Sequence, residues 1–403
     1  MHRGIDKPLL LLTITLVVVG FFIFTSASLG LLAREGASFG SVAFSQIVFG
    51  IIGGSIALFF TSAIHYRIWR KYAFYIFLFG IALTLAVFIP GLGFSHGGGT
   101  RWLSVGSFTF QPAEVLKVAF IIYMATWLSG THKQLAEFKH GTLPFLGLVG
   151  IVGVVMLLQP DTDTFLIMAA AATAMFITAG GHWRHVFGIG FVALLLIVAL
   201  AFTRPYIKDR LMTFIDPSLD PQGSGYQIKQ SLIAVGSGGV TGRGFGQSIQ
   251  KFEYLPEPIG DSIFAVYSEE FGFLGSTVLI GLFVAFALRG YKIAARATDL
   301  FGMLLVVGIM TVIVLQAFLN IAAMVGLVPV SGLPLPFISH GGTALLATLG
   351  AVGIVLNVEI DIDLQIRRRR RCGRTGSHQR ERLLRRRDRP RVASRRPRRR
   401  EAS

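Results

Sequence analysis

Long apolar segments recur along almost the whole chain, and short polar breaks separate them. A bilayer core about 30 Å thick requires roughly 20 apolar residues in a helix, because a helix satisfies its own backbone hydrogen bonds there. Hydrophobic residues make up 53% of the chain and charged residues only 15%, which excludes an ordinary soluble domain. The pattern predicts an all-α polytopic membrane protein with about ten transmembrane helices, at residues 8–30, 41–64, 72–90, 112–129, 143–158, 164–180, 185–203, 262–288, 301–326 and 339–358.

Two of these assignments have alternatives. The first segment is interpreted as an uncleaved span because nine apolar segments follow it, and a cleaved signal peptide is the alternative. The fifth and sixth segments are short and only residues 159–163 separate them. They form either one re-entrant element or two spans, and a proline with two aspartates favours a turn between two spans.

Basic residues are distributed unevenly between the two sets of loops. With a cytoplasmic N-terminus, 29 Lys and Arg residues lie inside, 8 lie outside and Lys117 lies within a span. Because positive residues favour the cytoplasmic side, both termini are predicted to be cytoplasmic. The large loop at 203–261, between the seventh and eighth spans, is then extracytoplasmic. Residues 1–358 form the membrane domain.

The remaining segment, 359–403, is strongly basic, with 18 arginines against 6 acidic residues. It shows no apolar period, so it is predicted to be a disordered cytoplasmic tail that lies against anionic lipids. No aromatic residue interleaves its arginines, and a specific nucleic-acid partner is not expected. The single cysteine, Cys372, excludes an internal disulfide framework.

A long polar, glycine-rich segment interrupts the apolar pattern between Asp216 and Gly275. Long loops are usually functional or disordered, and the aromatic residues spaced along this one predict an ordered, functional loop. Its glycines are too irregular for a dinucleotide fingerprint. They are interpreted as backbone freedom for a lid or a segment that faces a partner.

Charged residues within spans are costly and are functional candidates by default. Glu114 and Lys117 are three residues apart on one face of the fourth span. They form either a mutually neutralising pair or the polar wall of a substrate cavity. Gln111 stands at the start of the same span. Arg101, beside Trp102, either anchors the chain at the outer interface or binds a phosphate.

Asp261 stands immediately before the eighth span. An isolated aspartate there would be a helix N-cap. Glu257 precedes it, and Glu269 and Glu270 follow about two turns into the span. Because a helix N-terminus favours an anion, an ionised Asp261 at the outer membrane face is positioned to accept a proton.

Asp161, Ser339 and His340 are secondary candidates, as are Glu269 and Glu270. Asp161 and Asp163 flank the turn before the sixth span, where Asp163 is a good N-cap and a metal site has only weak support. His340, next to Ser339, is either a proton carrier or a hydrogen-bonded interface residue.

Seven stretches resemble the SEDS family, the ten-span polymerases of shape, elongation, division and sporulation. The resemblance covers about residues 8–358. It is specific because the seven stretches occur in the same order as in the family. The stretch at 246–257 is closer to the division member FtsW than to the elongation member RodA. The matching stretches are Arg101-Trp102, FQPAEVLK (110–117), QPD (159–161), DPSLDPQGSGYQIKQSLIAVGSGG (216–239), GQSIQKFEYLPE (246–257), DSIFAVYSEEFG (261–272) and LPLPFISHGG (333–342).

The resemblance implies peptidoglycan glycosyltransfer from lipid II to a growing glycan strand, on the outer face of the bacterial cytoplasmic membrane. It implies that Asp261 is catalytic and that Arg101, Glu114 and Lys117 match the family's polar residues. It also implies a class B penicillin-binding protein as partner, among other divisome proteins, and a place at the division septum. The chain departs from the family pattern at Ile259-Gly260, Ser262 and His340, and has QPDTDT where the family has QPDLGT.

The residues suit this chemistry. Asp261 is the predicted general base for the attacking sugar hydroxyl, and undecaprenyl pyrophosphate leaves with inversion at the sugar. The leaving group requires cations, and a divalent ion such as Mg²⁺ is possible, although the sequence names no metal site. The predicted substrate-binding residues are Arg101, Gln111, Glu114, Lys117, Arg243, Lys251, Tyr254 and Glu257.

Other functions remain open from the sequence. A lipid II flippase without chemistry would also place charges within its spans. An elongation-type polymerase and a scaffold whose loop docks partners are further alternatives.

Overall fold

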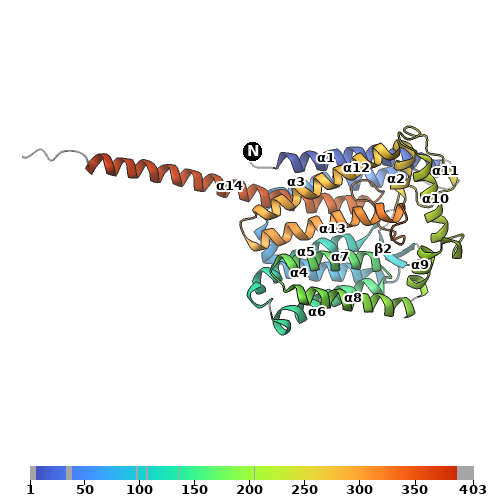
Figure 1. Ribbon diagram of the computed structural model, residues 1–403, viewed down its shortest axis with the longest axis horizontal. Helices are drawn as coiled ribbons and strands as arrows, with labels where there is room; N and C mark the ends of the chain where they lie inside the picture. Colours follow the sequence, from blue (N-terminus) through green and yellow to red (C-terminus); the bar gives the residue numbers. More distant parts are fainter. Residues whose placement is uncertain are drawn as a thin grey trace, which may run out of the picture.

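The computed structural model describes residues 6–32, 39–96, 99–105, 108–135, 137–203 and 205–387, and shows a bundle of long, roughly parallel helices (Figure 1). A helix lies at each of the ten predicted positions. These helices are α1 (Lys7–Leu32), α2 with η1 and α3 (Phe39–Phe44, Ser45–Gly53, Gly54–Ala63), α4 (Arg67–Leu85), α5 (Pro112–Thr131), α6 (Leu143–Leu158), α7 (Thr162–Thr178), α8 (Trp183–Thr203), α12 (Ile263–Arg296), α13 (Leu300–Met324) and α14 (Gly342–Arg387).

The predicted all-α polytopic class is confirmed. Within the described part of the chain, eight helices are long and apolar enough to cross a membrane. Helix α7 is shorter, with 17 residues, and α8 has 21. The count of ten spans stays a prediction.

The bundle has two ends that differ in what they contain (Figure 1). We call the end where α1 begins and α14 projects the tail end. The opposite end, which holds the segment between α8 and α12, we call the site end. Because both ends of the described chain lie at the tail end, the arrangement agrees with the predicted placement of both termini on one side.

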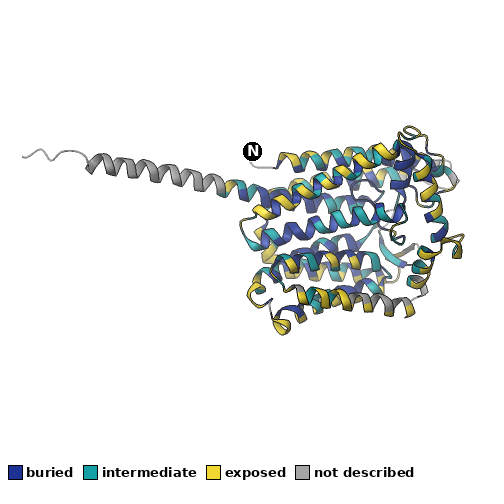
Figure 2. Cartoon of the chain, viewed as in Figure 1, coloured by how far each residue is buried: buried dark blue, intermediate teal, exposed yellow. Residues whose placement is uncertain are grey.

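Helices α13 and α14 form the centre of the bundle, as Figure 2 shows by their dark and intermediate colours. Two-thirds (67%) of the apolar window is buried in each, against 17% in Val42–Ala63. Helix α14 packs closely on α3, because a Cβ atom on Gly353 would lie 2.0 Å from Thr61 Oγ1. The Thr61 hydroxyl donates to the Gly350 carbonyl over 2.8 Å. Small residues allow such close contact between membrane helices.

Helix α12 is broken at Gly272, whose backbone has φ +65° and ψ −162°. The glycine-rich turn after α10 (Ser224–Ser237) fills this break. The backbone N–H groups of Arg243 and Gly244 donate to the Glu269 and Glu270 carbonyls over 3.0 and 2.9 Å. A Cβ on Gly272 would lie 2.3 Å from the nitrogen of Gly242, so glycine is required there. These glycines therefore hold the turn on α12, and the interpretation of the segment as a lid or as a partner-facing segment stays a prediction.

The predicted loop at 203–261 is largely helical. It contains α9 (Pro205–Ile215), the short η5 (Pro217–Leu219), α10 and α11 (Gln250–Glu253). Asp220 starts α10, because its carboxylate accepts from the N–H groups of Gly223 and Ser224 over 2.9 and 2.8 Å. The loop is an ordered cap on the site end.

The sequence analysis missed a small antiparallel sheet between α4 and α5. Its strands are β1 (Gly93–His96), β2 (Gly99–Val105) and β3 (Phe108–Phe110), in the order β1-β2-β3. Leu103 pairs with Gly93 on one side and with Phe110 on the other. Strands this short, next to a glycine run, carry too little alternation to be recognised.

The basic tail also differs from the expectation of disorder. Helix α14 continues to Arg387 and projects from the bundle (Figure 1). Arginine is a good helix former, and extending an existing helix avoids the cost of nucleation. Residues 388–403 lie outside the described residues.

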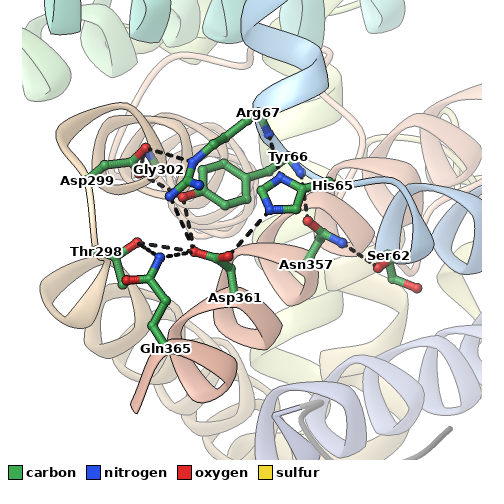
Figure 3. A network of polar contacts seen from close by, with 10 residues as sticks. All are labelled: Ser62, His65, Tyr66, Arg67, Thr298, Asp299, Gly302, Asn357, Asp361 and Gln365. Atoms are coloured by element: carbon green, nitrogen blue, oxygen red, sulfur yellow. Dashed lines mark hydrogen bonds and ion pairs between the residues drawn. The ribbon is translucent and has the colours of Figure 1, made fainter. Parts of the chain in front are cut away.

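A polar network closes the tail end (Figure 3). The Tyr66 hydroxyl donates to Asp299 over 2.9 Å, and its N–H donates to Asn357 Oδ1 over 2.7 Å. Asp361 lies 3.4 Å from His65 and 3.6 Å from Arg67. The network ties together the segment before α4, the connection between α12 and α13, and the middle of α14.

Candidate active site

Asp261 lies at the site end, in the turn that leads into α12. Residue Ser262 is the helix N-cap, so Asp261 does not take the capping position that an isolated aspartate would have there. The turn is closed by the N–H groups of Gly260 and Ser262, which donate to the Glu257 carbonyl over 3.0 and 3.3 Å. Glu257 adopts φ +46°, which is rare for a residue with a side chain. The Asp261 carboxylate is therefore not used to cap α12.

The surroundings of Asp261 keep its carboxyl group protonated to higher pH than usual. Burial raises its pKa to about 6, a hydrogen bond from Gln227 opposes this, and the nearby Glu257 charge raises it again. Arg210 lowers the pKa by a smaller amount. A carboxyl group with this pKa is an effective proton acceptor near neutral pH.

Asn320 of α13 fixes the backbone of this turn. Its side-chain NH₂ group donates to the carbonyl oxygens of Asp261 and Leu333, each over 2.7 Å. Asn320 is buried. The turn before α12 and the segment before α14 are therefore held against the same α13 residue.

The secondary candidate Ser339 has a similar positioning contact. Its hydroxyl donates to the Gly260 carbonyl over 2.6 Å and accepts from the Leu335 N–H over 2.7 Å. The N–H of His340 donates to the Ile259 carbonyl over 2.7 Å. The imidazole of His340 stacks on Phe24, with ring centroids 6.0 Å apart. Both residues thus hold the turn through bonds to its carbonyls.

Glu114 and Lys117 form the mutually neutralising pair that was one of the two interpretations, and their role in a substrate cavity stays a prediction. They form a buried ion pair of 2.8 Å on α5, and they line a small cavity with Gln316 and Pro336. Lys117 also donates to Gln316 Oε1 over 2.9 Å, and Gln316 donates to the Pro334 carbonyl over 2.8 Å. Because Gln316 lies one turn before Asn320, one face of α13 links this pair to the Asp261 turn.

Arg101 bonds to backbone. Its guanidinium donates to the carbonyls of Gln159 (3.2 Å) and Pro160, and so joins β2 to the turn between α6 and α7. Gln111 precedes α5 as its N-cap residue without a side-chain cap bond. In the turn between α6 and α7, the N-cap residue of α7 is Asp161, which accepts from the Thr164 N–H over 3.4 Å. The expected cap, Asp163, lies inside the helix instead.

Lys251 is completely buried, which differs from its predicted contact with substrate. Its ammonium forms an ion pair of 2.7 Å with Glu270, and donates to Ser26 of α1 over 3.0 Å. Ser26 in turn donates to Glu270 over 2.6 Å. A buried, paired lysine is better explained as an anchor that fastens the segment between α10 and α12 to α1 and α12.

Glu269 provides a second anchor beside the first. It accepts from the Ser248 hydroxyl over 2.5 Å and from the N–H groups of Ile249 and Gln250, each over 3.2 Å. Arg243 lies 3.5 Å from Glu269 and is partly exposed. Tyr254 is exposed. Of the cations predicted in this segment, Arg243 is the one that reaches the surface.

Sequence analysis did not single out Arg210. Its guanidinium forms a 2.6 Å ion pair with Asp163. It also lies close to Asp261, because a Cβ on Gly332 would be 3.8 Å from Arg210 Nη2 and 3.9 Å from Asp261 Oδ2. No motif marked this arginine, since it is one of several basic residues in an amphipathic stretch. Among the described residues, no group of three or more His, Cys, Asp and Glu side chains lies close enough to hold a metal ion.

The chain matches the sequence model of the cell cycle protein family FtsW/RodA/SpoVE over residues 7–363. It is 39% identical over 353 residues to stage V sporulation protein E of Bacillus subtilis, covering 88% of this chain and 96% of that protein. It is 38% identical over 359 residues to a probable peptidoglycan glycosyltransferase FtsW of Geobacter, covering 88% of this chain and 97% of that protein.

Two solved structures are similar to this one over 89% of the chain. One comes from a study of a peptidoglycan synthase complex that coordinates polymerisation and crosslinking, with a TM-score of 0.74, 26% identity and 99% of that chain covered. The other is the rod shape determining protein RodA of Thermus thermophilus, with a TM-score of 0.66, 25% identity and 98% of that chain covered.

Proposed function

The chain belongs to the FtsW/RodA/SpoVE family of cell cycle proteins, and from this premise we propose that it is a peptidoglycan glycosyltransferase that polymerises lipid II. The observation that carries the proposal is the environment of the Asp261 carboxyl group. Asp261 precedes α12 without capping it, and burial raises the pKa of its carboxyl group to about 6. Relatives that carry the name peptidoglycan glycosyltransferase support the reaction class.

In the proposed reaction Asp261 takes the proton of the 4-hydroxyl of an incoming lipid II sugar. The hydroxyl oxygen bonds to the anomeric carbon of the growing strand as the bond from that carbon to pyrophosphate breaks. The leaving group is a lipid pyrophosphate. A single displacement requires one base and no carboxylate nucleophile, so the configuration at the sugar inverts.

The other polar residues have distinct parts in this proposal. Asn320 and Ser339 hold the backbone of the turn, so the Asp261 carboxylate keeps one orientation. Glu114, Lys117 and Gln316 form a polar wall in the membrane interior. A divalent cation such as Mg²⁺ would supply further charge for the leaving group.

We further propose that the site end faces outward from the cytoplasmic membrane and that both termini are cytoplasmic, as the loop charges predict. The similarity to a chain from a peptidoglycan synthase complex supports a class B penicillin-binding protein as partner. The FtsW relatives support a role in division at the septum, with other divisome proteins. Anionic lipids would bind the arginines of the basic segment 359–403.

Polymerisation of purified lipid II tests the proposal. Asp261→Asn is expected to lower the rate about 10²- to 10⁴-fold, the usual contribution of a general base. Asp209→Asn, an exposed aspartate on α9, is the matched control. Assays with and without the penicillin-binding partner and Mg²⁺ define what the reaction requires.

The same preparation distinguishes the main alternative. A flippase would move fluorescent lipid II across vesicles without lengthening it. Transport without polymer from the native protein, or full polymerisation by Asp261→Asn, would contradict the proposal.

A further inference from the structure

The predicted second span, built from α2, η1 and α3, contains a polar side chain that is deeply buried. Only 17% of the apolar window of Val42–Ala63 is buried, so most of this span faces outward. Gln46 is nevertheless only 2% exposed. Gly50 and Gly54 follow at intervals of four residues and are buried as well. Because a buried amide requires hydrogen-bond partners, Gln46 has to find them on a neighbouring element.

The partner of Gln46 is the end of the segment that precedes α14. The Gly341 N–H donates to Gln46 Oε1 over 3.1 Å. The Gln46 NH₂ group donates to the Ser339 carbonyl over a longer distance, 3.4 Å. Since a backbone N–H can only donate and a carbonyl can only accept, the two contacts agree on one orientation of the amide. A single side chain therefore binds the backbone on both sides of His340.

The segment that Gln46 binds is the one that contacts the Asp261 turn. Ser339 and His340 donate to the carbonyls of the two residues immediately before Asp261, over 2.6 and 2.7 Å. Gln46 makes no such contact itself, and acts on the turn only through these two residues. The chain of contacts thus runs from the second span to the backbone that carries the proposed base.

Gln46 belongs to η1, a π-helix of nine residues. Such helices are rare and occur frequently at functional sites. Missing side chains bring η1 close to the start of α14. A Cβ on Gly342 would lie 2.5 Å from the Ser45 carbonyl, and a Cβ on Gly50 would lie 3.0 Å from the Leu345 side chain. This close approach allows the Gln46 amide to reach backbone groups.

The segment before α14 needs support because its backbone is strained. Phe337 has φ +67°, a conformation that persists for such a residue only where its surroundings enforce it. Phe286 of α12 packs edge-to-face on Phe337, with ring centroids 5.5 Å apart. Gly20 of α1 allows close contact, since a Cβ there would lie 2.3 Å from the Phe337 carbonyl. Helices α1 and α12 thus hold the middle of the segment, and Gln46 holds its end.

We propose that Gln46 is a positioning residue for Asp261: it fixes residues 339–341, and through them the turn that orients the Asp261 carboxylate toward the attacking hydroxyl. The inference rests on the proposed glycosyltransfer and adds a residue from outside the turn. Without the amide, the Gly341 N–H loses its partner and the contacts of Ser339 and His340 to the turn open more often. The carboxylate then spends less time in the productive orientation, which lowers kcat without weakening substrate binding.

The tail end offers a matched control. Asn357 is also a buried amide that binds backbone on two sides, because the Tyr66 N–H donates to it and it donates to the Ser62 carbonyl, each over 2.7 Å (Figure 3). Asn357→Leu removes an amide of the same kind at the end of the bundle opposite Asp261. Any effect of lost stability alone should therefore appear in both variants.

The first measurement is lipid II polymerisation by the full-length protein in detergent. Gln46→Leu is expected to lower kcat about 10- to 10²-fold and to change KM by less than about twofold, because a small misplacement of reacting groups slows the chemical step. Asn357→Leu should keep the native kcat per folded molecule. Gln46→Glu retains an oxygen acceptor for the Gly341 N–H and should recover part of kcat.

The second measurement, hydrogen–deuterium exchange of the backbone, needs no catalysis. Gln46→Leu is expected to speed exchange in residues 257–262 and 339–341 at least about tenfold, since the hydrogen bonds that protect them open more often. Asn357→Leu should leave these two stretches unchanged and speed exchange around Tyr66 instead.

A native kcat in folded Gln46→Leu, or native exchange in both stretches, would overturn the positioning role. An equal loss of kcat in Asn357→Leu, or a raised KM with native kcat in Gln46→Leu, would overturn it as well. All of these results leave polymerisation by the native protein intact. A native protein that shows the expected exchange pattern but does not polymerise lipid II would contradict the proposed function alone.

Discussion

The two ends of the bundle treat their acidic residues differently. At the tail end, Asp299 and Asp361 contact Tyr66, Arg67 and His65 (Figure 3). At the site end, Asp261 forms no ion pair among the residues that the structure describes, and its pKa is raised to about 6. Paired acids fix helices relative to one another, whereas a carboxylate without a cationic partner remains available for proton transfer. The contrast supports the proposed placement of the chemistry at the site end.

The site end also contains acidic residues that are paired with other side chains or backbone groups. Glu270 is buried with Lys251 and Ser26, and Glu269 binds the start of α11. These pairs fasten the segment after α10 to α12 and α1. The unpaired Asp261 is thus held by a frame of paired groups, which maintains its orientation.

The largest expected effect on stability comes from breaking that frame. Lys251→Met leaves Glu270 buried and uncompensated, which costs about 3–5 kcal/mol of folding free energy. The double variant Lys251→Met/Glu270→Met removes both charges and should recover most of that loss. Thermal unfolding in detergent measures both. Equal stability of the single variant and the native protein would show that the ion pair is not an anchor.

At the tail end, Tyr66→Phe tests the network of Figure 3. The variant loses a hydrogen bond to a charged group at a fully buried side chain, at a cost of about 1.5–3 kcal/mol. Lipid II polymerisation per folded molecule is expected to stay unchanged, because the network lies at the opposite end from Asp261. A selective loss of activity at native stability would contradict the division of roles between the ends.

Giving Asp261 a cationic neighbour should make the site end resemble the tail end. The Gln227 amide donates to Ser262 Oγ over 2.9 Å and lies near enough to lower the pKa of Asp261. Gln227→Lys places an ammonium there, and a nearby cation lowers a carboxyl pKa by about 1–3 units. The weaker base is expected to reduce kcat/KM at pH 7 by about tenfold, corresponding to about 1.4 kcal/mol. Gln227→Met is the control that removes the amide without adding charge. An unchanged rate in the lysine variant would argue against proton transfer to Asp261.

The raised pKa of Asp261 also affects stability. For an aspartate whose pKa rises on folding, the protonated form favours the folded state, so this contribution is lost as the pH rises through about 6. Asp261→Asn is therefore expected to unfold at a slightly higher temperature than the native protein at pH 8. The two should converge near pH 4. A native protein that is more stable than the variant at pH 8 would contradict the sign.

The sequence predicted the helices well because a bilayer demands apolar runs of defined length. It also singled out Asp261, Glu114 and Lys117 as candidates, since charges are conspicuous in or beside such runs. Gln316 and Asn320 were less visible, although two amides one turn apart in the ninth span are a usable signal. The break at Gly272 and the anchoring of Lys251 depend on contacts between distant segments, which no local pattern reports.

Arg210 shows the same limit most clearly. In sequence it is one basic residue among several outside the spans, and only the fold brings it beside Asp163 and the Gly332 position. The short sheet that carries Arg101 was missed because its strands have at most seven residues. Contacts between segments distant in sequence determine both the placement of Arg210 and the formation of the short sheet.

The pH dependence of kcat/KM for lipid II polymerisation tests the role of Asp261 most directly. The native protein is expected to lose activity below about pH 6, tenfold per pH unit, as the base becomes protonated. The residual activity of Asp261→Asn should not show this limb, and that of Asp209→Asn should show it unchanged. A native rate that stays constant from pH 7 to well below pH 6, or an Asp261→Asn variant with the native profile, would contradict the assignment of Asp261 as the general base.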